Sequence, residues 1–243
     1  MRLALVHARV ESLRYLRFPA YALPTLLFPG LLMLLVGRAF VRGEPERMLV
    51  GFAAMAVLTV TFFQFGVGIA TSRTTAWEAY LRTLPVGPLT RLAGRVLSAL
   101  AFATATVGVV AIVGTSVYGV HPPAGRAVAS LVALLLGSVP FALLGIAFGY
   151  WLPANAALPV ANLAFLPLAI GGALWARPEG LPHNADVVSQ LLPTRSWMEV
   201  LDSVATGDHP LPLHHVAALV GWTVVFGTLA WWGYRRDEGE RFR

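Results

Sequence analysis

Long apolar blocks alternate along this chain with short segments that carry its charged residues. Six blocks reach the length of about 20 residues that a helix needs to cross the hydrocarbon core of a bilayer. None of the six has Asp, Glu, Lys, Arg or His in its interior. The pattern predicts six transmembrane helices, at Phe18–Gly37, Met48–Ala70, Val96–Tyr118, Ala127–Trp151, Ala156–Ala176 and Val216–Tyr234.

The composition supports a multi-pass membrane protein that forms a single all-α transmembrane domain over residues 1–243. Of the 243 residues, 57% are hydrophobic and 12% are charged, whereas a soluble domain carries about 25% charged residues. All 18 basic residues are arginines, and cysteine is absent. The chain therefore lacks the lysine of a phosphate-binding P-loop, and it has neither disulfides nor thiolate metal sites.

The arginines indicate the orientation of the chain in a cell inner or plasma membrane. The segments before span one, between spans two and three, and after span six hold 12 of the 18 arginines. Arginine and lysine are enriched in cytoplasmic loops. We therefore expect both termini to be cytoplasmic, and we assign the net charge of +6 to membrane topology, with no nucleic acid partner.

Residues 1–17 place Leu3, Val6, Val10 and Leu13 on one helical stripe among arginines. This stripe predicts an interfacial helix on the inner leaflet. The alternative is a solvated basic tail that only sets the orientation.

The cytoplasmic segment 71–95 predicts a short helix between two prolines. Thr75 and Glu78 have the spacing of a capping box, and Glu78 precedes Arg82 by four residues, the favourable order for an ion pair. Pro85 ends the helix and Pro88 is suited to open the next one. So short a helix is marginal in water, so its aromatic and leucine face must pack against the membrane surface or a partner protein.

The external segment 177–212 holds two short apolar stretches on either side of Pro193. Neither stretch is long enough to span a bilayer, and a break at proline predicts a re-entrant or interfacial hairpin on the outer side. An ordinary packed extracellular loop is the other interpretation.

The sequence offers little chemistry for catalysis or metal binding. Asp208-His209 and His214-His215 do not have the spacing of a common zinc site, no nucleophile elbow occurs, and we expect neither catalytic nor metal-binding residues. Because the predicted spans lack ionisable groups, a proton relay within the membrane is not available.

Three neutral polar residues inside the spans, Thr59, Gln64 and Asn162, are candidates for a translocation path. Amides of this kind also hydrogen-bond neighbouring helices. Gly145 and Gly149 form a GxxxG motif for close helix packing, either within the chain or across a dimer.

The run from Trp77 to Pro88, Trp-Glu-Ala-Tyr-Leu-Arg-Thr-Leu-Pro-Val-Gly-Pro, with Arg91, Arg95 and Leu97–Leu100 after it, resembles the cytoplasmic segment of ABC-2 type ABC transporter permeases. Leu192-Pro193-Thr194 is similar to the short outer motif of that family. With the six-span layout, the resemblance covers nearly the whole chain.

The resemblance implies the permease subunit of an ATP-driven exporter, with no ATPase site of its own. Two copies of a separate ABC ATPase would bind ATP and magnesium, and a second permease, identical or homologous, would complete the path; the cargo is not identified. The family's coupling helix would bind the ATPase through Thr75, Trp77, Glu78, Tyr80, Leu81, Arg82, Leu84 and Pro85. The alternatives are a self-contained secondary transporter or channel, and a membrane assembly factor that transports nothing.

Overall fold

The computed structural model describes residues 2–17, 19–40, 45–76, 88–174 and 183–240, and every regular element in these ranges is a helix. The helices are α1 (Arg2–Leu16), α2 (Pro19–Phe40), α3 (Pro45–Val60), the π-helix η1 (Thr61–Val67), α4 (Gly68–Ser72), α6 (Pro88–Tyr118), α7 (Ala124–Gly137), α8 (Val139–Trp151), α9 (Ala154–Gly171), α10 (His183–Gln190), α11 (Pro193–Thr206) and α12 (Leu213–Glu240).

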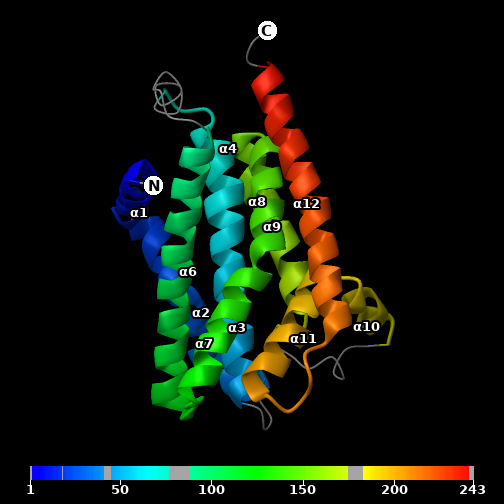
Figure 1. Cartoon of the computed structure of the whole chain (residues 1–243). Helices are drawn as coiled ribbons and strands as arrows, with labels where there is room; N and C mark the ends of the chain where they lie inside the picture. The colour runs from blue at the N-terminus through cyan, green and yellow to red at the C-terminus, as the bar shows by residue number, and fades with distance from the viewer. Residues whose placement is uncertain (1, 18, 41–44, 77–87, 175–182, 241–243) are drawn as a thin grey trace.

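The centre of the bundle is one continuous rod made of α3, η1 and α4. α2, α6, α8 and α9 pack around this rod, whereas α12 packs against α8 and α11 (Figure 1), and 89% of the rod's most apolar stretch is buried inside the protein. The corresponding stretch of α12 is only 17% buried. Among the candidate spans in the described residues, the rod is the most deeply buried.

Within the residues that the structure describes, five helices are long and apolar enough to cross a membrane, at Pro45–Ser72, Leu92–Tyr118, Ala124–Trp151, Ala154–Gly171 and Leu213–Glu238. A shorter apolar helix, Ala22–Gly37, lies within α2. The described part of the chain is thus all-helical, with several helices able to span a membrane.

Three predicted spans differ from the structure, two of them at an end and one because it is interrupted. Span five was expected to reach Ala176, but α9 ends at Gly171, where Ala173 takes a left-handed conformation with φ of 56°. Span four is divided at Ser138 into α7 and α8, since Pro140 lacks an N–H group and favours the first turn of a new helix. Span six continues to Glu240, beyond the apolar block that defined it.

The bundle has two distinct ends (Figure 1). The end of α4, the turn between α8 and α9 and the C-terminus of α12 lie together, and we call this the Arg73 end. The beginning of α7 and the helices α10 and α11 lie at the opposite end, which we call the α11 end.

The segment before span six forms two helices, as its apolar stretches predict. Pro193 is the first residue of α11 and separates it from α10. Trp197, Met198 and Leu201 on α11 are completely buried, in contact with α7, α3, α12 and α9. By contrast, Leu191, which precedes the proline, is exposed. The second half of this segment is therefore part of the protein core.

The GxxxG motif packs α8 against the central rod. A methyl group on Gly145 would lie 2.6 Å from the carbonyl oxygen of Thr61, and one on Gly149 would lie 2.6 Å from Cβ of Ile69. The Phe62 and Phe148 rings meet edge to face beside the motif, with centroids 5.7 Å apart. Both glycines thus make close contacts within the chain.

Candidate functional site

The candidate site is the base of the segment that connects α4 to α6, at the Arg73 end. Ser72 ends α4, and Ala76 is the last residue described before the connection resumes at Pro88. The predicted contact residues Trp77, Glu78, Tyr80, Leu81, Arg82, Leu84 and Pro85 lie outside the described residues. α6 begins at Pro88, as the sequence predicts for a proline that opens a helix.

Threonine hydroxyl groups hydrogen-bond to the backbone of the turn that follows α4. Thr75 Oγ1 donates a hydrogen bond of 2.7 Å to the carbonyl oxygen of Ser72, and Thr74 Oγ1 donates one of 2.9 Å to that of Thr71. The predicted capping partner of Thr75, Glu78, is outside the described residues. The same two carbonyls also accept backbone N–H groups, from Thr75 at 3.0 Å and from Thr74 at 3.4 Å, so each hydroxyl bond reinforces the turn.

Arg73 lies at the end of α4 and reaches two other helices. Its Nη1 donates to Oδ1 of Asp237 on α12 at 2.6 Å and to the carbonyl oxygen of Tyr150 at 2.9 Å. Its Nη2 donates to the carbonyl oxygen of Leu152 at 3.0 Å. The Arg73 and Asp237 side chains are 15% and 11% exposed, so the pair is largely shielded from water and from salt.

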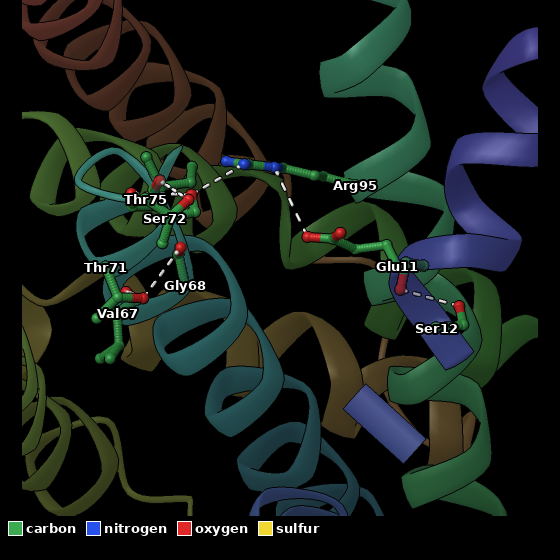
Figure 2. A network of polar contacts seen from close by, with 10 residues as sticks. Glu11, Ser12, Val67, Gly68, Thr71, Ser72, Thr75 and Arg95 are labelled. Atoms are coloured by element: carbon green, nitrogen blue, oxygen red, sulfur yellow. Dashed lines mark hydrogen bonds and ion pairs between the residues drawn. The ribbon is translucent and has the colours of Figure 1, made fainter. Parts of the chain in front are cut away.

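Arg95 connects α6 to two other helices at the same base (Figure 2). Its Nη2 donates to Oγ of Ser72 at 2.9 Å, and its Nε lies 3.8 Å from Oε1 of Glu11 on α1. One helical turn away, Ser12 Oγ donates to Oγ of Ser98 at 2.9 Å. Both ends of the segment between α4 and α6 are therefore held by a charged side chain.

α1 packs on α6 through polar and small residues, and its apolar stripe faces outward. Ala8, Glu11, Ser12 and Tyr15 face the bundle, and the Tyr15 ring meets Phe102 edge to face at 5.9 Å. The stripe that predicted an interfacial helix is exposed, at Leu3, Val6, Val10 and Leu13. The sequence pattern found this outward face but gave no sign of the contacts on the other side.

The contact of α1 is expected to weaken at alkaline pH. Burial, and after it the charge of Glu11, raise the pKa of Tyr15 from 10.0 to about 12. Because Tyr15 holds its proton more tightly in the folded state, its contribution to stability is complete below pH 10 and is lost as the pH rises toward 12. Thermal unfolding measured from pH 9 to 12 should show this decline, and Tyr15→Phe should reduce it. An identical pH profile for Tyr15→Phe would contradict the assignment to Tyr15.

The three polar residues predicted for a translocation path lie in different surroundings. Thr59 is buried and donates to the carbonyl oxygen of Met55 at 2.8 Å. Gln64, in η1, is 4% exposed, and its Nε2 has no hydrogen-bond partner. Asn162 is exposed on α9. The structure thus buries two of the three in the interior and leaves the third on the surface of the bundle.

The π-helix is a feature that periodicity does not predict. Thr61 Oγ1 donates to the carbonyl oxygen of Leu58 at 2.9 Å, next to the bond of Thr59. Threonine hydroxyls that bond back to the helix compete for its carbonyls, and π-helical turns are frequent at functional sites. The one available signal was the pair of threonines two residues apart in an otherwise apolar run.

Comparison with known proteins decides the family. The model of the ABC-2 family transporter proteins matches residues 42–232. The chain belongs to this family. It is also 20% identical over 197 residues to a protein described as the putative transport permease YvfS of Bacillus subtilis (strain 168). The aligned residues cover 81% of this chain and 80% of that protein.

Membership of the ABC-2 family makes this chain a component of a membrane transport system. The family match begins after α1 and α2 and includes both Arg73 and Arg95. It ends before Asp237. The contact between Arg73 and Asp237 therefore joins the matched region to the part of α12 that lies beyond it.

Proposed function

We propose that this chain is the permease subunit of an ATP-driven ABC exporter, and that a separate ABC ATPase binds the segment between α4 and α6. The observation that carries the proposal is the anchoring of both ends of that segment, by Arg73 at one end and by Arg95 at the other. A displacement of such a segment is passed directly to the helices that hold it.

We propose that the energy for transport comes from ATP bound by a partner subunit. This chain has no lysine, so it has no P-loop of its own to bind the phosphates of ATP. ATP and magnesium are bound by the partner ATPase, and this chain is not an enzyme. Two ATPase subunits and two permeases, identical or homologous, make up the transporter.

The Arg73 end faces the cytoplasm in this proposal, and both termini are cytoplasmic. α2 is span one and completes the set of six, since its 22 residues extend about 33 Å at 1.5 Å per residue, enough for a bilayer core. α1 lies along the inner leaflet with its exposed stripe in the lipid. Thr59, Gln64 and Asn162 are the polar groups proposed for the translocation path.

Changing Leu81 and Leu84 together to aspartate should abolish binding of the ATPase. Both residues belong to the predicted apolar face, and two carboxylates cannot be buried in an apolar groove without partners. An ABC ATPase encoded in an adjacent reading frame is co-expressed with the chain, and the amount that co-purifies is measured. The wild-type complex should form and the variant complex should not.

The matched control is Leu191→Asp, the same exchange at an exposed position between α10 and α11. This variant should retain the ATPase, because the α11 end is on the opposite side of the membrane. A double variant that still binds and stimulates the ATPase as the wild type does would refute the proposed docking site. ATP-independent transport by the purified chain would refute the proposed function altogether.

A further inference from the structure

One guanidinium at the Arg73 end joins three helices that are remote in the sequence. Arg73 is 77 residues from Tyr150 and 164 from Asp237. Tyr150 is in the last turn of α8 and Leu152 directly follows the helix, where carbonyls have no partner within the helix. Arg73 therefore satisfies the end of α8 and at the same time pairs with α12.

Arginine is suited to this position in a way that lysine is not. The contacts lie in three directions, to one carboxylate and two carbonyls, and a planar guanidinium holds its donors in fixed directions, whereas an ammonium is a compact charge on a flexible stem. The guanidinium also lies over the Tyr150 ring, 5.8 Å from its centroid. The Tyr150 ring in turn meets Tyr234 of α12 edge to face at 5.5 Å.

Close packing already makes α4 and α8 one unit, because Gly149 of α8 lies against Ile69 of α4. α12 joins this unit where Gly233 is covered by Trp151, whose Nε1 would lie 2.7 Å from a methyl group on Gly233. Arg73 joins the ends of the same three helices, α4, α8 and α12, by hydrogen bonds. A force applied to the end of α4 is thus transmitted to α8 and α12 together.

The other end of the connecting segment is held differently. Arg95 contacts Ser72 through a neutral hydroxyl and Glu11 at 3.8 Å, and it lies on α6, beside α1. The two ends of one segment are therefore anchored to two groups of helices: α4, α8 and α12 through Arg73, and α1 and α6 through Arg95. The hydrogen bond from Arg95 to Ser72 of α4 is a direct link between the two groups.

We propose that Arg73 is the positioning residue that makes the tip of α8 and the C-terminal part of α12 move with the segment between α4 and α6. This inference rests on the proposed function, since the ATPase supplies the displacement. When the segment moves, α8 and α12 shift with α4 relative to α6 and α1. Without Arg73, a displacement of the segment moves the turn after α4 but not α8 and α12. The ATPase then remains bound, but ATP no longer shifts these helices.

The test uses the absence of cysteine in the chain, which allows two spin labels to be placed without background. Ala93→Cys on α6 and Arg235→Cys on α12 are both exposed positions, one in each of the two groups of helices. The distance between the labels is measured in the complex with the ATPase, in vesicles, without nucleotide and with ATP. In the wild-type background, ATP should change this distance.

Arg73→Ala should keep the ATPase bound and lose the ATP-dependent change in distance. Asp237→Asn leaves the two carbonyl contacts of Arg73 in place and should show a smaller ATP-dependent change in the distance between the labels. This variant provides the test if Arg73→Ala does not fold. The matched control is Arg47→Ala, which breaks an ion pair of similar length and burial at the α11 end, 2.5 Å from Asp202. This control should keep the full change.

Two results would overturn the role of Arg73. One is an unaltered change of distance in Arg73→Ala, and the other is an equal loss in Arg47→Ala, which would mean that any broken ion pair has the effect. A wild-type chain that binds no ATPase, or whose helices do not respond to ATP, would instead refute the proposed function. The two failures are therefore distinguishable.

Discussion

Replacing Gly145 by leucine is expected to prevent the chain from folding to a single compact species. Even a methyl group at this position would lie 2.6 Å from the carbonyl oxygen of Thr61 and 3.2 Å from Cβ of Phe65. The nearest atom belongs to the backbone of the π-helix and cannot rotate away as a side chain does. Overpacking a well-filled core costs about 1–3 kcal/mol, and leucine would push α8 off the central rod. Size-exclusion chromatography and the melting temperature of the purified protein measure the effect.

Glycine-to-alanine variants provide the controls for this expectation. Gly145→Ala should lower the melting temperature. Gly108→Ala on α6 and Gly221→Ala on α12, where a methyl group meets no atom within 4 Å, should leave it unchanged or raise it, since alanine favours a helix over glycine by about 1 kcal/mol. Equal melting temperatures for Gly145→Ala and Gly221→Ala would show that the GxxxG motif is not closely packed within the chain.

Hydropathy and arginine placement predict the positions of most helices, because a bilayer permits only segments that satisfy their own backbone. They do not predict where a helix stops when the end lies in a turn, as at Gly171, where the apolar block continues to Ala176. Nor do they predict which span is central. The rod of α3, η1 and α4 is no more apolar than α7 and α8, and only the packing of the whole bundle buries it.

The location of the candidate site is a prediction from the sequence, whereas the contacts at its base come from the structure alone. Proline and capping signals marked the segment between spans two and three, and α6 does begin at Pro88. In the sequence, Arg73 is only a topology signal, and Arg95 is a topology signal and part of the family resemblance, because an arginine next to a span has the same pattern whether it faces water or another helix. Asp237 lies 164 residues from Arg73, and a single sequence holds no record of such a distant pair.

Removing the Trp197 side chain should destabilise the protein more than the loss of any other aromatic ring on its α11 end. Trp197 is completely buried, its ring centroid lies 5.0 Å from that of Phe141, and its indole lies against Gly137. Trp197→Ala leaves a large cavity and should cost about 3–5 kcal/mol. Trp197→Phe should cost much less, because it keeps the contact with Phe141 and removes a buried indole N–H that has no partner, a group costly to bury unpaired. The shift of the unfolding midpoint in denaturant measures both.

Trp231→Ala on α12 is the control, since that ring is 57% exposed and its removal should shift the midpoint little. The comparison tests how the segment before span six is held. A helix that lies in the membrane surface would depend on its lipid-facing residues, and Trp197→Ala would then have no more effect than Trp231→Ala. A helix packed into the bundle depends on the ring buried among α7 and α8. Because α11 contacts α3, α7, α9 and α12, the loss of this ring should loosen the whole α11 end while the Arg73 end keeps its contacts.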